Sequence, residues 1–247
     1  MRAMLDPGDE VLIPQPSYVS YVPCAQLIHA VPVIIELKEE NEFRLTKQEL
    51  LDAITDKTKM LVMPFPNNPT GAIMEKEDLE EIAKVCVEKD IFVLSDEIYS
   101  ELTYKDKHVS IASMPGMKER TVVINGFSKS YAMTGWRIGY TGSSKEIAKM
   151  MGSVQSHQTS NPNSIAQKAA VEALTGPQDS VVKMHAEFDK RRKYMYERIC
   201  KMPLVSTIEP MGAFYVFVDA SEVLGKKYKD TVVESVAQMA EILINDY

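Results

Sequence analysis

Short, mostly apolar runs recur along the chain and are the strongest constraint on its fold. They occupy residues 10–13, 60–63, 91–94 and 122–124. Runs of this length with little polar alternation are typical of strands covered on both faces. Apolar residues recur at helical spacing before the third run, at Leu79, Ile82, Ala83 and Cys86. Strands alternating with helices predict an α/β fold, a mostly parallel sheet with helices on both faces.

Polar and aromatic residues follow each of these predicted strands, at Tyr18, Asn68, Asp96, Tyr99 and Lys129. Each of them alone has an ordinary explanation, because an acid after a strand is often only a helix cap. In a parallel sheet, however, the carboxyl ends of the strands meet at one edge, and ligands bind beyond that edge. The sequence therefore predicts a binding site built from these residues.

The segment after the fourth run, residues 126–139, reads GFSKSYAMTGWRIG. It holds Lys129 and, eight residues later, Arg137. An amine and a guanidinium placed in this way suit a Schiff-base lysine that faces a phosphorylated aldehyde. A surface lysine remains an alternative when this segment is considered alone. The two other polar clusters, at residues 67–71 and 96–99, favour the interpretation of Lys129 as part of a binding site.

Together, the three clusters resemble the class I and II aminotransferases, a fold-type I family that uses pyridoxal 5'-phosphate. The resemblance rests on the lysine segment, on Asn-Pro-Thr-Gly at residues 68–71 and on Asp-Glu-Ile-Tyr at residues 96–99, and it spans nearly all 247 residues. The aspartate and aromatic aminotransferase branch is the most similar. The resemblance implies transamination between an amino acid, such as aspartate or an aromatic one, and a 2-oxo acid such as 2-oxoglutarate. C–S β-elimination at the same cofactor and a non-catalytic cofactor-binding domain are the alternatives.

The resemblance also implies a role for individual residues. Lys129 resembles the catalytic lysine that bonds the cofactor and then moves a proton. Asp96 resembles the carboxylate that keeps the pyridine nitrogen protonated, and Arg137 resembles the phosphate clamp. The remaining cofactor-binding candidates are Tyr99 and Asn68 at the ring hydroxyl, Tyr18 stacked on the ring, and Ser128 at the phosphate. Ser128 enters because Gly126 stands where many family members have a phosphate-binding serine.

The same resemblance implies that the chain begins and ends inside the family domain. We expect a cofactor-binding large domain over residues 1–180, and a linking helix with a partial small domain over residues 181–247. Within the second part, residues 212–218 are predicted to form a strand whose aromatic residues lie in the core, and residues 231–247 an amphipathic helix. The arginine that grips the substrate carboxylate in the family has no counterpart here, because Arg191, Arg192 and Arg198 are expected on a solvated helix face.

Composition restricts the classes of partner. The net charge of −7 argues against nucleic acid and against an anionic membrane, and no apolar stretch is long enough to span a bilayer. Three widely spaced cysteines fit no disulfide framework and favour a reducing cytoplasm. The four histidines share no ligand spacing, so no metal site is expected. The resemblance implies a homodimer.

Overall fold

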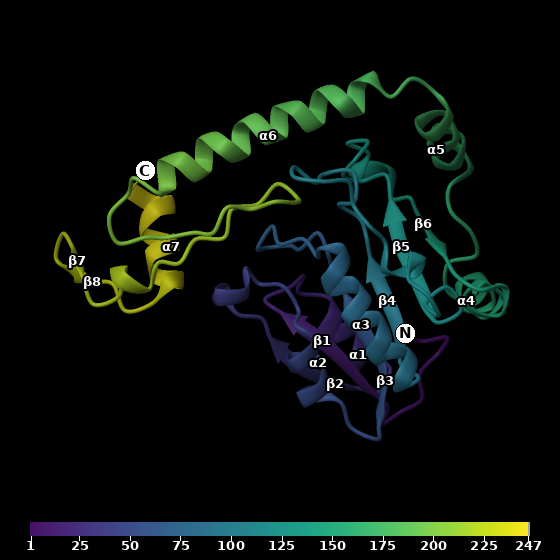
Figure 1. The fold of residues 1–247 in the computed structure, drawn as a ribbon. Helices are drawn as coiled ribbons and strands as arrows, with labels where there is room; N and C mark the ends of the chain where they lie inside the picture. Colours follow the sequence, from purple (N-terminus) through teal and green to yellow (C-terminus); the bar gives the residue numbers. More distant parts are fainter. Residues whose placement is uncertain (247) are drawn as a thin grey trace.

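The computed structural model describes residues 1–246 (Figure 1). Six strands form one sheet in the order β2-β1-β3-β4-β5-β6. All neighbours are parallel except β5 and β6, which are antiparallel. The strands are β1 (Glu10–Gln15), β2 (Val31–Glu36), β3 (Thr58–Met63), β4 (Phe92–Asp96), β5 (Thr121–Gly126) and β6 (Gly139–Gly142). The apolar runs therefore contribute β1, β3, β4 and β5, and the predicted sheet is confirmed.

Helices α2, α4 and α5 begin at polar residues whose side chains cap free backbone N–H groups. Thr46 and Glu49 form a capping box at the start of α2, and the Asn163 side chain accepts the Ala166 N–H at the start of α5. Within residues 1–246, no helix has the length and apolar character needed to cross a bilayer. The helices are α1 (Tyr21–Gln26), α2 (Lys47–Ala53), α3 (Lys76–Glu88), α4 (Lys145–Gln158), α5 (Ser164–Thr175), α6 (Asp179–Ile199) and α7 (Val236–Asp246).

The sheet separates two apolar clusters, because successive side chains of a strand point to opposite faces. Leu12 and Leu61 lie in the cluster that includes buried residues of α2 and α3. Their chain neighbours Ile13 and Met60 lie in the other cluster, which includes Ala25 of α1. Helices therefore cover both faces of the sheet, as predicted, and the strand ends are left to form the site.

The part of the chain after the sheet differs from the prediction in two places. Residues 212–218 form no strand in the described structure, because one isolated bridge, Thr103 with Gly212, holds their first residue and a second, Ser206 with Asp219, lies just beyond their end. A strand needs a neighbour along its length to pair its backbone groups. The last helix begins at Val236 rather than at residue 231, and the Gln238 N–H bonds the Ser235 side chain at its start. Residue 247, the last of the predicted helix, lies outside the described residues.

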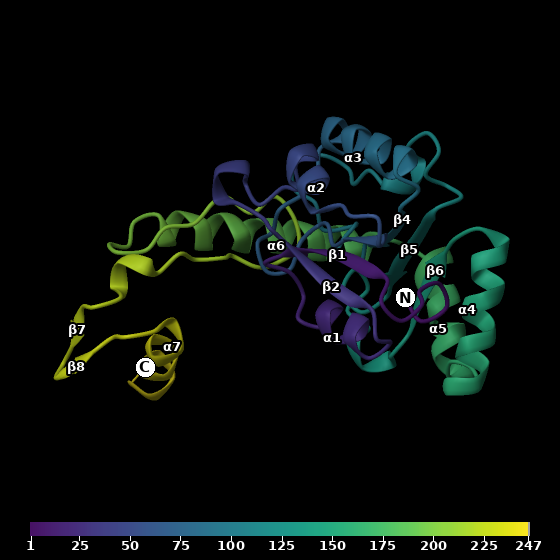
Figure 2. The same cartoon turned by 90° about the horizontal axis from the view of Figure 1, so that it is seen from below.

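The residues that precede α7 form a small hairpin instead of a helix. Strands β7 (Lys227–Tyr228) and β8 (Thr231–Val232) pair antiparallel there. Helix α6 leads from α5 toward this end of the molecule, and Figure 2 shows the hairpin and α7 at the opposite end from α4 and α5.

Arg192 contradicts the expectation that the arginines of the long helix are solvated. The Arg192 side chain is 6% exposed, whereas that of its neighbour Arg191 is 66% exposed. Arg192 is buried because Asp189, on the same helix, and Glu209, beyond the end of that helix, both accept hydrogen bonds from it. A charged side chain is stable in such a position only when it is paired.

Candidate active site

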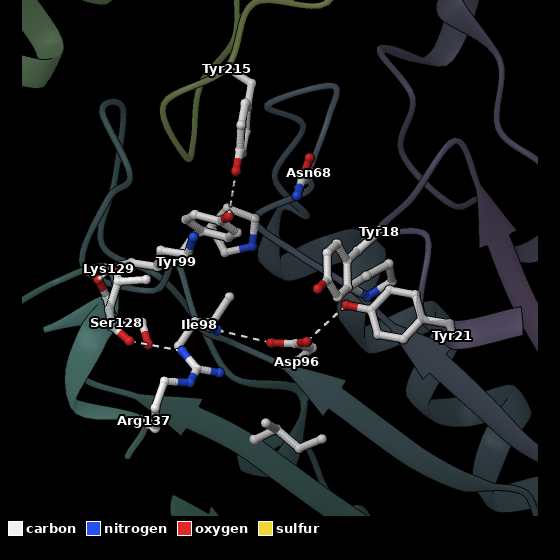
Figure 3. Close-up of a pocket in the computed structure, with 14 residues that line it drawn as sticks. Tyr18, Tyr21, Asn68, Asp96, Ile98, Tyr99, Ser128, Lys129, Arg137 and Tyr215 are labelled. Atoms are coloured by element: carbon white, nitrogen blue, oxygen red, sulfur yellow. Dashed lines mark hydrogen bonds between the residues drawn. The ribbon is translucent and has the colours of Figure 1, made fainter. Parts of the chain in front are cut away.

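A cavity of about 370 Å³ opens at the carboxyl-terminal edge of the sheet (Figure 3). All seven residues that the sequence singled out as candidates line it. They are accompanied by residues that the sequence analysis did not select, above all Tyr21, Thr134 and Tyr215. The complete lining is Tyr18, Tyr21, Pro64, Pro66, Asn68, Asp96, Ile98, Tyr99, Ile124, Ser128, Lys129, Thr134, Arg137 and Tyr215.

The topology explains why residues so far apart in sequence meet in this cavity. Strand β1 lies between β2 and β3, so the chain reverses its direction of travel across the sheet at that point. Such a switch point leaves a crevice at the strand ends. Tyr18 follows β1, Asn68 follows β3 and Lys129 follows β5, while Asp96 is the last residue of β4.

Asp96 is a partly buried carboxylate with two donors. The Tyr21 hydroxyl donates to Asp96 Oδ2 at 2.8 Å, and the Ile98 N–H donates to Asp96 Oδ1 at 3.2 Å (Figure 3). Burial raises the pKa of Asp96 above its ordinary value, and the two hydrogen bonds act in the opposite direction. The sequence analysis did not select Tyr21. Its position three residues after Tyr18, at the start of the helix that follows β1, could have identified it.

Replacing Tyr21 by Phe is expected to raise the pKa of Asp96 further, because it removes one of the two hydrogen bonds that stabilise the charged carboxylate, and such a bond contributes about 1.5–3 kcal/mol. A raised carboxyl pKa means that the folded protein holds a proton that the unfolded chain has released. The free energy of unfolding therefore falls as pH rises from about 4 to the folded pKa, and Tyr21→Phe widens this range. Carboxyl carbon NMR titration of the cofactor-free chain measures the change. An unchanged Asp96 pKa in this variant would show that the Tyr21 hydroxyl does not stabilise the Asp96 carboxylate.

Tyr99 and Tyr215 meet on another side of the cavity. Their hydroxyl oxygens are 2.9 Å apart, and the Tyr99 ring also meets the Phe214 ring edge-on. Burial and the Tyr215 hydroxyl both raise the pKa of Tyr99. Phe214 and Tyr215 both pack, partly buried, against a small apolar cluster, and Tyr215 also lines the cavity, whereas Phe217 is exposed. The expectation that the aromatic residues of 212–218 lie in the core is therefore wrong for Phe217 and incomplete for Tyr215.

Two cationic side chains enter the cavity near Ser128. Lys129 Nζ lies 5.6 Å from the centre of the Tyr99 ring and 5.4 Å from that of Phe214. Arg137 Nη1 donates to the Thr134 carbonyl at 2.8 Å. The Thr134 hydroxyl in turn donates to the Ser128 carbonyl at 2.9 Å, which ties the two segments together. This corner offers a guanidinium, an amine and two hydroxyl-bearing residues, the donor set of an anion site.

Gly126, which stands where a serine would supply another hydroxyl, is tightly packed at the point where a side chain would begin. A Cβ atom on Gly126 would lie 3.1 Å from Gly139 Cα and 3.3 Å from the Ile138 carbonyl oxygen, both on the neighbouring strand or just before it. An additional hydroxyl donor for an anion at this corner would therefore come from Ser128, because the Thr134 hydroxyl already donates its proton to the Ser128 carbonyl.

The geometry agrees with what comparisons with known proteins find. The family model for aminotransferase class I and II matches residues 1–247. Aspartate aminotransferase of Geobacillus stearothermophilus is 45% identical over 97% of this chain, and that of Bacillus subtilis (strain 168) is 44% identical over 98%. The crystal structure of the aspartate aminotransferase from Rhizobium meliloti superposes over 99% of the chain with a TM-score of 0.94 at 37% identity.

The chain spans about three fifths of the length of these relatives, with shares of 62%, 63% and 62% respectively. Within that span the match to the family model runs from the first residue to the last. Both the sequence similarity and the shared fold extend over the sheet and over the strand ends that carry the cavity. The chain belongs to the class I and II aminotransferase family.

Proposed function

We propose that this chain forms the cofactor site of a pyridoxal-phosphate-dependent aminotransferase, which transfers an amino group between an amino acid and a 2-oxo acid. Aspartate and 2-oxoglutarate are the proposed pair, since the relatives named above are aspartate aminotransferases. The observation that carries the proposal is the convergence of Lys129, Asp96 and Arg137 on one cavity from three separate segments.

The residues present fit pyridoxal phosphate at both of its charged ends. Arg137 and the Ser128 hydroxyl would hold the phosphate. The Asp96 carboxylate, kept in place by Tyr21, would hold the protonated pyridine nitrogen. When bound, the cofactor supplies an aldehyde that condenses with amines and a ring that accepts the electron pair of a substrate carbon.

The aromatic and amide residues would complete the binding of the ring. Tyr99 and Asn68 would bond the ring hydroxyl oxygen, and the half-exposed ring of Tyr18 would stack on the cofactor face. In the protein alone, the Tyr99 hydroxyl already has Tyr215 as a partner. Tyr215 thereby holds Tyr99 in a defined orientation before any ligand binds, which is the preorganisation that binding sites require.

Lys129 is the residue that we assign to the chemistry. Its amine would bond the cofactor and, once released, would carry the proton taken from the substrate α-carbon at Nζ. The rings of Tyr99 and Phe214 flank this amine and shield part of it from water.

We further propose the division at residue 180, a homodimer and a cytoplasmic location. The division is supported by α6, which begins at Asp179 and leads away from the sheet. The cytoplasmic location is supported by the three free cysteines, Cys24, Cys86 and Cys200.

A turnover assay tests the proposed reaction. The purified chain, supplied with pyridoxal phosphate, is incubated with aspartate and 2-oxoglutarate, and formation of glutamate and oxaloacetate is followed. Cofactor binding is measured separately by absorbance. Binding with glutamate formation supports the proposal. In a parallel incubation with a cysteine conjugate, pyruvate release without glutamate formation in the first incubation would replace transamination by β-elimination. Cofactor binding without either reaction would leave a non-catalytic domain.

A further inference from the structure

One segment outside the sheet, residues 209–215, carries Tyr215 into the cavity, and we call it the docking segment. Backbone hydrogen bonds attach it to two loops of the sheet domain. The N–H groups of Met211 and Gly212 both donate to the Gly71 carbonyl, at 3.0 and 2.8 Å. The Ala213 N–H donates to the Leu102 carbonyl at 2.9 Å. Because Gly71 ends the loop that holds Asn68, the positions of that loop and of the docking segment depend on each other.

The packing at this attachment is too close for any side chain on the two glycines. Gly71 has φ +72°, and a Cβ there would lie 2.3 Å from Pro210 Cβ. A Cβ on Gly212 would lie 2.6 Å from the Cβ of Pro66, a residue that lines the cavity. A small displacement of the docking segment would therefore be transmitted to the cavity wall.

Arg192 fastens the docking segment to α6. Its Nη1 donates to Glu209 Oε1 at 2.7 Å and to the Pro210 carbonyl at 3.0 Å. Its Nε and Nη2 donate to Asp189 Oδ1 at 3.0 and 2.8 Å. The guanidinium also stacks on the Tyr104 ring, 5.1 Å from the ring centre. Only a planar fork of donors can serve all of these partners at once.

We propose that Arg192 is a positioning residue for the cofactor site, an inference that rests on the function proposed above. Arg192 does not line the cavity. It holds Glu209 and Pro210, and through them it keeps Tyr215 beside Tyr99 and keeps the Asn68 loop in place. Placement of these ring-binding groups depends on a charge network outside the site.

Hydrogen exchange of the full chain, followed amide by amide, tests this role. In Arg192→Met, exchange at Met211, Gly212 and Ala213 is expected to rise about tenfold or more, the scale of losing one charge-assisted hydrogen bond. Exchange at Val93, inside the sheet, is expected to stay unchanged, and the dissociation constant for pyridoxal phosphate to rise about tenfold. Arg191→Met is the matched control, because Arg191 is exposed and, within residues 1–246, forms its one ion pair along the helix with Glu187. In Arg191→Met, neither the exchange rates of the docking segment nor the dissociation constant for pyridoxal phosphate is expected to change.

Two milder variants keep the test decisive if Arg192→Met does not fold. Arg192→Lys retains the charge without the fork, and Glu209→Gln retains Asp189 and the Pro210 carbonyl as partners. Both are expected to raise exchange in the docking segment selectively, by less than Arg192→Met. An equal rise at Val93, or no change in the docking segment, would overturn the proposal. If the unaltered chain fails to bind pyridoxal phosphate, the proposed function falls, while the exchange pattern still decides whether Arg192 holds the segment.

Discussion

Replacing Lys129 by Ala is expected to abolish transamination and covalent attachment of the cofactor while leaving the fold intact. Lys129 is half-buried in a loop after β5, and its amine lies over the rings of Tyr99 and Phe214, contacts that contribute only about 0.5–1 kcal/mol. Its removal should therefore cost little free energy of unfolding. The loss of a positioned proton-transfer group alone lowers a rate by about 10²–10⁴-fold, and loss of the covalent bond adds to this.

The measurement pairs steady-state turnover with mass spectrometry of the borohydride-reduced protein. Lys149→Ala is a suitable control, because Lys149 is an exposed lysine on α4. That variant should keep both turnover and the adduct. Undiminished turnover in Lys129→Ala would show that another group performs the proton transfer, and the assignment of the site would fall with it.

Replacing Asp96 by Asn is expected to weaken cofactor binding and turnover strongly. The substitution keeps the size of the side chain but removes the charge that would pair with the pyridinium. Loss of one partner of a buried, hydrogen-bonded charge pair costs about 2–5 kcal/mol, which corresponds to roughly 30-fold to several thousand-fold. Asn also carries an amide donor, so one of the two present donors, Tyr21 or the Ile98 N–H, could face another donor.

The effect of Asp96→Asn is measured as the dissociation constant for pyridoxal phosphate and as kcat at saturating cofactor. Asp56→Asn, an exposed substitution in the loop before β3, controls for the change in net charge. We expect both quantities to be unaltered in that control. A dissociation constant for Asp96→Asn within twofold of that of the unaltered chain would exclude Asp96 as the partner of the pyridine nitrogen.

The sheet and most of the site could be predicted because their signals are local. An apolar run that ends in a polar residue identifies a covered strand and its ligand-facing end without knowledge of any distant contact. Asp96 lies two residues and Lys129 five residues beyond the end of such a run. The topology then brings them together, because parallel strands share one edge.

The contacts that were not predicted join residues far apart in the chain or depend on a partner strand. Tyr215 meets Tyr99 across 116 positions, and its sequence pattern is that of an apolar core strand. Arg192 is buried because of Glu209, which lies 17 positions later and beyond the end of the helix. Helical periodicity assigned Arg192 to a solvated face, since periodicity contains no information about a segment that folds back.

The most direct test of the central claim is the site of cofactor attachment in the unaltered chain. Purified protein is mixed with pyridoxal phosphate, its visible absorbance is recorded, and the mixture is reduced with borohydride, digested and mapped by mass spectrometry. We predict an absorbance band of the bound cofactor and a single major adduct on Lys129. No band, or adducts spread over exposed lysines, would contradict the assignment of this cavity as a pyridoxal phosphate site.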